Sequence, residues 1–235
     1  MHLIDYLIQS GWLKTPEIIE AFRKIKREDF LRPFEAFGEG GLPDEMKNMA
    51  ELNEALPIGF GQTISQPLTV AFMLELLQPE AGEKILDVGA GSGWTSALLA
   101  FIVRHKQSNK NIGGGKVIAL ELVPQLAEFG RRNVAKYNFI EKGFVEFISA
   151  DGSRGYEKEA PYDKILASAA IYPDNQAKGR GAANLPESWK EQLKTGGRIV
   201  CPIESSVWLF VKKSADEFEK KEFPGFVFVP LIQKQ

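Results

Sequence analysis

The chain has 235 residues, of which 44% are hydrophobic and 26% charged, the proportions of an ordinary globular protein with one α/β core. Its formal net charge of -2 gives no reason to expect nucleic acid or an anionic membrane as the main partner. The one cysteine, Cys201, excludes an internal disulfide, and we expect neither a signal peptide nor a membrane-spanning run. We therefore expect a cytoplasmic protein that binds no nucleic acid and no membrane.

The N-terminal part of the chain predicts helices. Apolar residues recur at helical spacing over residues 3–8, and Thr15 followed by Pro16 is typical of a helix start, with Thr15 as the N-cap. Residues 32–56 are less regular and predict a loop with one helix at most. A strongly apolar helix is expected over residues 68–77.

Strands and helices alternate in the rest of the chain. The predicted strands are residues 84–88, 116–120, 145–149, 162–167 and 197–202, and the predicted helices are 94–103, 124–137 and 186–194. This alternation predicts a mostly parallel, doubly wound sheet. Two further strands, 207–212 and 226–229, are separated by the charged turn 213–221, which leaves no room for a crossover helix. They predict a hairpin, so the sheet should end in an antiparallel edge strand.

A glycine-rich loop follows the first of these strands. Gly89, Gly91 and Gly93 alternate with other residues where the strand meets a helix, so the backbone of the loop can approach a ligand closely. The pattern alone is weak evidence. A dinucleotide fingerprint would have its third glycine at position 94, and Trp94 stands there, which argues against NAD or FAD.

Acidic residues stand at the predicted strand ends of the same sheet. Glu121 directly follows the second strand and could accept both ribose hydroxyls of a nucleoside, while Asp151 and Gly152 follow the third strand, near an adenine amino group. Asp87 would face the ammonium group of the ligand through water. An adenosine ligand without a diphosphate fits this set, and S-adenosylmethionine is the obvious candidate. Taken singly, Asp87 could be a helix cap, Glu121 a helix-start charge and Asp151 part of a turn.

The chain resembles the protein-L-isoaspartate O-methyltransferase family. The matching stretches are PIGFGQTISQP (57–67), ILDVGAGSG (85–93), VIALE (117–121), ADG (150–152), QLKTGG (192–197), FVPL (228–231) and the N-terminal AFRKIKREDFLRP. ILDVGAGSG is typical of methyltransferases in general, whereas PIGFGQTISQP is specific to this family. The resemblance covers nearly the whole chain.

The resemblance implies a Rossmann-like class I S-adenosylmethionine-dependent methyltransferase with an N-terminal helical extension. Such an enzyme methylates the free α-carboxylate of L-isoaspartyl residues in damaged peptides and proteins, and leaves S-adenosylhomocysteine. The methyl ester closes to a succinimide, which reopens partly to normal aspartate. Two alternatives stay open: a related carboxyl methyltransferase with a dedicated peptide or acid as its substrate, and a non-catalytic module that binds the cofactor or a protein.

PIGFGQTISQP contains no acid or base, and the implied chemistry explains why. The attacking carboxylate is ionised at neutral pH, and the methyl group is already activated by its sulfonium. By resemblance, Ser65 donates a hydrogen bond that orients the carboxylate, and Thr63 and Gln62 shape the pocket; alternatively, Ser65 only caps the helix that begins near Pro67. The cofactor-binding residues expected are Asp87, Gly89, Gly91, Ser92, Gly93, Glu121, Leu122, Asp151 and Gly152. No cysteine–histidine cluster supports a metal site.

We expect a single methyltransferase domain over residues 1–235, and a monomer. Its expected parts are a helical extension (1–56), a substrate loop (57–67), a cofactor-binding core (82–203) with a loop insertion (171–184), and C-terminal strands (206–235). The insertion and the segment 38–54 depart from the family pattern. The insertion is either a lid, in which Lys178 and Arg180 attract a substrate carboxylate, or a tolerated surface loop.

Overall fold

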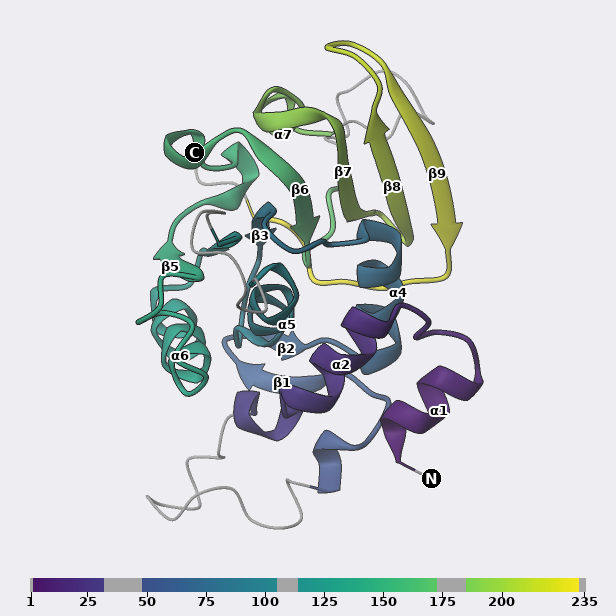
Figure 1. Cartoon of the computed structure of the whole chain (residues 1–235), viewed down its shortest axis with the longest axis vertical. Helices are drawn as coiled ribbons and strands as arrows, with labels where there is room; N and C mark the ends of the chain where they lie inside the picture. Colours follow the sequence, from purple (N-terminus) through teal and green to yellow (C-terminus); the bar gives the residue numbers. More distant parts are fainter. Residues whose placement is uncertain (1, 32–47, 105–113, 173–184, 233–235) are drawn as a thin grey trace.

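The structure is a computed structural model that describes residues 2–31, 48–104, 114–172 and 185–232. A seven-stranded sheet forms its centre, with the strand order β5-β4-β3-β6-β7-β8-β9 (Figure 1). The strands are β3 (Lys84–Val88), β4 (Lys116–Glu121), β5 (Val145–Ser149), β6 (Tyr162–Ala167), β7 (Leu193–Ile203), β8 (Ser206–Lys212) and β9 (Phe218–Pro224).

The sheet is parallel over its first five strands and antiparallel at one end. β3 pairs in parallel with β4 and β6, β4 with β5, and β6 with β7. β8 and β9 then continue the sheet in antiparallel pairs. The carboxyl ends of the five parallel strands therefore meet at one edge, where ligands bind on such sheets. The predicted doubly wound sheet with an antiparallel edge is confirmed.

Helices cover both faces of this sheet, which is why β3 and β4 are apolar and buried along almost their whole length. One face packs against a large hydrophobic cluster, and the other packs against a smaller cluster that includes Trp189. The helices of the first cluster are α1 (Leu3–Gln9), α2 (Pro16–Lys24), α4 (Pro67–Leu77), α5 (Trp94–Val103) and α6 (Pro124–Ala135), and α7 (Glu187–Gln192) belongs to the second.

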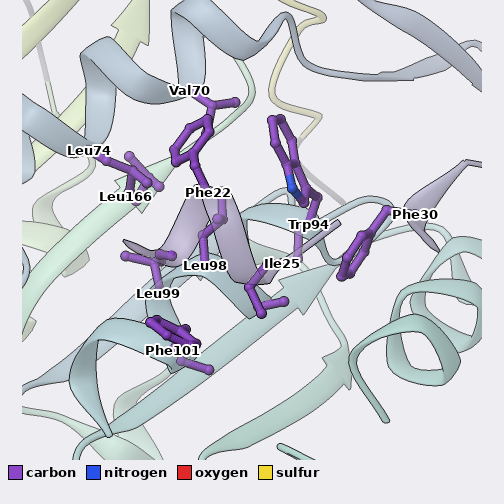
Figure 2. Packing of buried hydrophobic residues seen from close by; sticks show 14 of the residues in the cluster. Phe22, Ile25, Phe30, Val70, Leu74, Trp94, Leu98, Leu99, Phe101 and Leu166 are labelled. Atoms are coloured by element: carbon purple, nitrogen blue, oxygen red, sulfur yellow. The ribbon is translucent and has the colours of Figure 1, made fainter. Parts of the chain in front are cut away.

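α2 packs on α5 and α1 packs on α2, so both helices belong to the same core as the sheet. Phe22 and Ile25 lie close to Leu98 and Leu99, with Trp94 beside them (Figure 2). Thr15 occupies the predicted N-cap position of α2, but its hydroxyl donates to the carboxylate of Glu75 on α4 at 2.7 Å instead of capping the helix. Within the described ranges, no helix is long and apolar enough to cross a bilayer.

The predicted strand 207–212 is confirmed as β8, whereas the strand predicted over 226–229 was wrong in its position. The last strand is β9, Phe218–Pro224, which pairs with the whole of β8, and the turn between them is shorter than 213–221. The sequence of β9 is mostly charged because an exposed edge strand is protected by charged side chains, so hydrophobicity did not mark it. Residues 226–229 do not form a strand, and Pro230 forms an isolated parallel bridge with Ala170.

The helix expected over 186–194 is also shorter than predicted. It covers Glu187–Gln192, and β7 begins directly afterwards at Leu193. The loop insertion lies outside the described residues from position 173 to 184, and so do residues 38–47 of the other departing segment.

Candidate active site

Two clefts meet at the carboxyl edge of the sheet. The first, here called the glycine-loop cleft, is lined by the turn after β3, the end of β4 and the C-terminal residues 229–232. The second, here called the aromatic cleft, has a volume of about 990 Å³ and lies beside α4 and the segment 222–229. Thr63, Ser65, Ser168 and Val229 line both clefts, so they form the boundary between them.

Most residues predicted to hold a cofactor line the glycine-loop cleft. These are Gly89, Gly91, Ser92, Glu121, Leu122 and Gly152. Gly93 lies just beneath the cleft, and its φ of +83° favours glycine. A Cβ atom there would also lie 2.8 Å from the carbonyl oxygen of Gly130, so no other residue fits without a backbone shift. Gly93 therefore allows α5 to start close against α6.

Glu121 is held in place by the glycine loop that it faces. Its Oε2 accepts the N–H of Gly91 and its Oε1 accepts the N–H of Val123, both at 2.9 Å, and the residue is only 6% exposed. No cation pairs with it among the residues that the structure describes. A carboxylate has about four lone-pair positions, so two remain for hydroxyl donors in the cleft. The alternative role of Glu121 as a helix-start charge also fits, because Oε1 accepts the N–H of Val123, the N-cap residue of α6.

Asp87 lies beneath the surface of the glycine-loop cleft. It is fully buried, does not line either cleft, and its Oδ2 accepts a hydrogen bond from Ser96 Oγ at 2.6 Å. Its Oδ1 has no hydrogen-bond partner within the described part of the chain. Burial and, secondarily, the nearby charge of Glu121 raise the pKa of Asp87 to about 7, despite the hydrogen bond from Ser96. The site therefore contains a carboxyl group that is poised to ionise when a cation approaches.

Asp151 forms part of a turn. Its side chain accepts the N–H of Ser153 at 2.9 Å and caps a short 3₁₀ helix, Gly152–Arg154. Gly152 lines the cleft, and a Cβ atom on it would lie 2.5 Å from Val88 Cγ1, so only glycine permits this approach of the turn to β3. The turn interpretation of Asp151 is therefore correct for the structure, and its contact with an adenine stays a prediction.

The stretch 57–67 folds as a hairpin, which the sequence did not predict. β1 (Leu56–Gly59) and β2 (Gln62–Ile64) pair in antiparallel register, and the turn has positive φ at Phe60 and Gly61, as in a type I′ turn. The hairpin places Gln62 at the glycine-loop cleft, and Thr63 and Ser65 at both clefts.

Ser65 does not cap α4. The N-cap residue of α4 is Gln66, and the N–H of Leu68 is accepted by Asn53 Oδ1 at 2.9 Å. The capping alternative for Ser65 was therefore wrong, because Asn53 from another segment performs that role. The Ser65 side chain is half-buried at the boundary between the two clefts.

Aromatic rings form one wall of the aromatic cleft. Phe72 on α4 stacks on Phe226 at a centroid distance of 5.2 Å, and the edges of Trp12 and Phe223 meet it at 5.7 and 5.1 Å. The carboxylates of Glu54 and Glu222 also belong to the lining. The volume of this cleft lies at the upper end of the roughly 300–1,000 Å³ typical of ligand pockets, and its wall is largely apolar.

Comparison with known proteins gives a consistent result. A family model described as protein-L-isoaspartate(D-aspartate) O-methyltransferase matches residues 1–235. The chain belongs to this family. Protein-L-isoaspartate O-methyltransferase of Methanopyrus kandleri is 37% identical over 99% of this chain and 91% of its own length. Protein-L-isoaspartate O-methyltransferase 2 of Archaeoglobus fulgidus is 40% identical over 92% of this chain and 84% of its own length.

Solved structures of the family share the fold. A protein-L-isoaspartate O-methyltransferase structure superposes with a TM-score of 0.75 at 26% identity, over 97% of this chain and 64% of that one. A structure from Plasmodium falciparum, in complex with S-adenosyl-L-homocysteine, superposes with a TM-score of 0.76 at 22% identity, over 99% and 97% of the two chains. The predicted resemblance to the isoaspartate O-methyltransferase family and the predicted methyltransferase fold are confirmed.

Several residues of this methyltransferase site were missed in the sequence. The aromatic wall comes from three distant segments, and none of its rings belongs to a periodic pattern that marks a site. The C-terminal residues 229–232 line the glycine-loop cleft, and the family-like ending FVPL was the available signal for them. In the part of the chain that the structure describes, no group of acidic, histidine or cysteine residues could hold a metal ion.

Proposed function

We propose that this chain methylates the free α-carboxylate of L-isoaspartyl residues in damaged proteins, with S-adenosylmethionine as the methyl donor. The observation that carries the proposal is the position of Thr63 and Ser65 on the boundary between the two clefts. A peptide carboxylate in the aromatic cleft and a nucleoside in the glycine-loop cleft would meet at that boundary. Family membership supports the same assignment.

The residues of the glycine-loop cleft fit S-adenosylmethionine. Glu121 keeps two acceptor positions for ribose hydroxyls, Gly91 and Gly152 allow close approach, and the buried Oδ1 of Asp87 can receive an ammonium charge directly or through water. When bound, this cofactor supplies a methyl group activated by a sulfonium. The open volume of the cleft is about 80 Å³, below the roughly 300–1,000 Å³ of ligand pockets, so residues 229–232 would move outward on binding.

The protein's own contribution to the reaction is orientation. The substrate carboxylate is ionised at neutral pH, so no general base has to remove a proton from it. In the proposed arrangement, Ser65 Oγ donates a hydrogen bond to one carboxylate oxygen and directs the other toward the glycine-loop cleft. Thr63 and Gln62 shape the pocket around that carboxylate. Holding two reactants in line can contribute about 7–11 kcal/mol to the lowering of a barrier.

A matched pair of peptides tests the proposal. One peptide contains a single L-isoaspartyl residue, and the other has the same sequence with a normal aspartyl residue. We expect methyl transfer to the first and none to the second, because only the isoaspartyl linkage presents a free α-carboxylate on a lengthened backbone. Equal transfer to both peptides, or transfer to neither, would overturn the proposal. Transfer to neither would favour a dedicated peptide or acid as the substrate.

The proposal includes a monomer in the cytoplasm that binds isoaspartyl peptides and proteins, with no nucleic acid or membrane partner. Light scattering at increasing protein concentration tests the monomer, and a mass that rises toward that of a dimer contradicts it.

A further inference from the structure

The guanidinium of Arg27 is buried beneath the substrate hairpin. Arg27 begins a short 3₁₀ helix, Arg27–Phe30, and is only 7% exposed. It makes no ion pair with a carboxylate among the described residues. The charge of Glu51 acts on it electrostatically and favours its charged form. Burial lowers its pKa to about 10, so it remains charged at neutral pH. A buried cation is costly to maintain, which raises the question of what it does there.

Four backbone carbonyls accept hydrogen bonds from this guanidinium, while its buried Nε has no partner in the part of the chain that the structure describes. Nη1 donates to the carbonyl oxygens of Ala50 and Leu52, both at 3.1 Å. Nη2 donates to the carbonyl oxygens of Glu54 at 2.6 Å and Ser65 at 3.2 Å. Glu54 precedes β1 and Ser65 follows β2, so a single nitrogen joins the two ends of the hairpin.

The hairpin needs such an anchor. β1 has four residues and β2 has three, and their register is irregular between Pro57 and Gly59. A two-stranded sheet of this size is marginally stable in water by itself. Ile58 packs toward the glycine loop, since a Cβ atom on Gly91 would lie 3.4 Å from Ile58 Cδ1. Movement of the hairpin base would therefore shift Ser65 relative to the glycine loop.

The same guanidinium also contacts the other side of the site. Its Cζ lies 5.4 Å from the ring centroid of Trp94, within the range of a cation–π interaction. Trp94 is the first residue of α5, directly after the glycine loop, and it lines the glycine-loop cleft. The ring is fixed in turn by the edge of Phe22 at 5.6 Å. Arg27 is therefore in contact with both the hairpin and the start of α5.

We propose that Arg27 is a positioning residue that fixes the distance between the Ser65 hydroxyl and the glycine loop. This inference rests on the proposed function. Arg27 lines neither cleft, and acts through the backbone of Ser65 and the ring of Trp94. A misplacement of about 1 Å at a reacting centre can cost roughly 100-fold in rate, whereas binding energies respond much less. Loss of the anchor should therefore lower kcat and leave the affinities nearly unchanged.

The test compares Arg27→Lys and Arg27→Gln with the wild type. Lysine keeps the charge but has three N–H groups on one nitrogen, and glutamine has two, so neither can serve all four carbonyls. We expect kcat to fall 10- to 100-fold, with KM for an isoaspartyl peptide and the cofactor Kd within threefold of wild type. Arg23→Lys is the matched control, because Arg23 lies four residues earlier on the exposed side of α2, and it should leave all three values unchanged.

A double-mutant cycle separates positioning from general stability. If Arg27 acts through Ser65, adding Arg27→Lys to the Ser65→Ala variant should lower kcat by less than a further factor of three. Equal fractional losses in both backgrounds, or a weakened cofactor Kd with an unchanged kcat, would overturn the proposal. Loss of the fold in both Arg27 variants would also overturn it, because Arg27 would then hold the domain instead of the hairpin.

Amide hydrogen exchange keeps this test independent of the proposed function. The amides of residues 56–64 should exchange faster in Arg27→Lys, while those of β3 should exchange at the wild-type rate. Unchanged exchange in residues 56–64 would contradict the anchoring role. A wild-type protein that methylates no isoaspartyl peptide would overturn the proposed function, and the exchange rates would still decide whether Arg27 holds the hairpin.

Discussion

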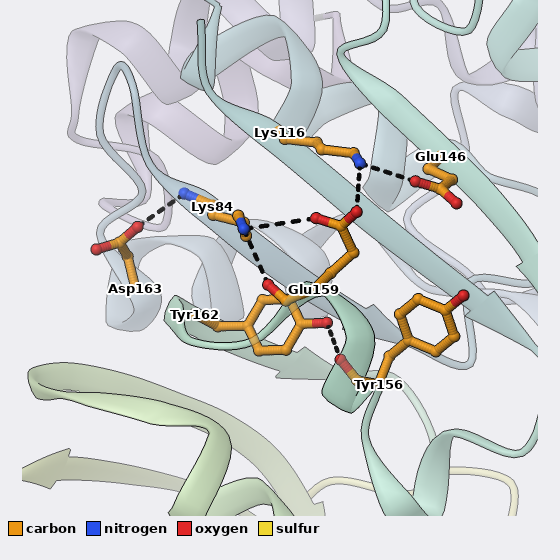
Figure 3. Close-up of polar contacts among 7 residues, drawn as sticks. All are labelled: Lys84, Lys116, Glu146, Tyr156, Glu159, Tyr162 and Asp163. Atoms are coloured by element: carbon orange, nitrogen blue, oxygen red, sulfur yellow. Dashed lines mark hydrogen bonds and ion pairs between the residues drawn. The ribbon is translucent and has the colours of Figure 1, made fainter. Parts of the chain in front are cut away.

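The amino and carboxyl edges of the parallel sheet differ in how their charged side chains are paired. At the amino edge, Lys116 Nζ lies 2.8 Å from Glu146 and 3.0 Å from Glu159, and Lys84 lies 3.4 Å from Glu159 (Figure 3). Asp163 accepts the backbone N–H of Lys84 there at 2.8 Å. Each carboxylate in this network has a cationic or backbone partner.

At the carboxyl edge, Glu121 and Asp87 have no cationic partner among the described residues. In the part of the chain that the structure describes, Glu121 accepts two backbone N–H groups, and one oxygen of the fully buried Asp87 has no hydrogen-bond partner. Paired charges at one edge satisfy each other and contribute to stability. Unpaired acceptors at the other edge are incomplete until a ligand arrives, which is the condition expected of a binding site. We conclude that the charged residues of the amino edge stabilise the fold, whereas those of the carboxyl edge serve ligand binding.

The largest effect is expected from Glu121→Ala. We expect the cofactor Kd to rise roughly 100-fold, because hydrogen bonds to a charged acceptor contribute about 1.5–3 kcal/mol each and the glycine loop also loses its partner. Calorimetric titration with S-adenosylhomocysteine measures it. Glu146→Ala is the control at the amino edge and should bind as the wild type does. An unchanged Kd in Glu121→Ala would remove this residue from the cofactor site.

Ser65→Ala should act on the rate. Removal of one hydrogen bond to the substrate carboxylate should lower kcat about 10- to 100-fold, since such a bond contributes about 1.5–3 kcal/mol. The Kd for S-adenosylhomocysteine should stay near wild type. Steady-state kinetics with an isoaspartyl peptide, combined with calorimetry, measures both quantities. A large loss of cofactor affinity with little change in kcat would argue for a structural role of Ser65.

Asp87 should make stability depend on pH. Its pKa in the folded protein is raised to about 7, whereas an unfolded aspartate has an ordinary pKa near 4. Between these values folding takes up a proton, so the free energy of unfolding contributed by Asp87 falls as the pH rises from about 4 to about 7. Asp87→Asn removes this titration and should be more stable than wild type at pH 8, by about 1–3 kcal/mol.

Urea unfolding at pH 5 and pH 8 measures this effect. The difference in unfolding free energy between Asp87→Asn and wild type should be larger at pH 8 than at pH 5. Ser96→Ala serves for comparison, because it removes the hydrogen bond to Asp87 Oδ2 and should increase the pH dependence. If the unfolding free energy of the wild type rises from pH 5 to pH 8 relative to that of Asp87→Asn, the raised pKa of Asp87 is contradicted.

The smallest effect is expected from Glu159→Gln at the amino edge. Glu159 joins Lys84 and Lys116, but these side chains are about a third exposed, so solvent screens the pairs. We expect a loss of about 0.5–1 kcal/mol in the free energy of unfolding and no change in kcat or cofactor Kd. Thermal unfolding and peptide assays measure these values. A loss of activity comparable to that of Ser65→Ala would contradict the division between the two edges.

Local patterns in the sequence were sufficient to predict the central sheet and the cofactor loop. Residues 84–88 are a short apolar run because β3 is buried on both faces, and the glycines follow it directly. Glu121 could be identified for the same reason, since it ends an apolar strand. Both signals come from residues that are neighbours in the chain.

The missed features depend on tertiary contacts. β9 has an exposed, charged sequence and is a strand only because β8 pairs with it. The hairpin turns at Phe60 and Gly61 without the Asn-Gly pair that usually marks a type I′ turn. Arg27 meets its acceptors 23 to 38 residues away, and no local pattern predicts that distance. Asp87 was placed at the correct strand, but its full burial depends on the packing of α5, which supplies Ser96.

The most direct test measures methyl transfer to the isoaspartyl peptide by variants from both edges in one series. The carboxyl-edge variants are Glu121→Ala and Ser65→Ala, and the amino-edge variants are Glu146→Ala and Glu159→Gln. Initial rates at low cofactor concentration should fall at least 10-fold for the first pair and stay within twofold of wild type for the second. Rates that fall equally in both pairs, or that persist in the carboxyl-edge variants, would contradict the assignment of function to the carboxyl edge.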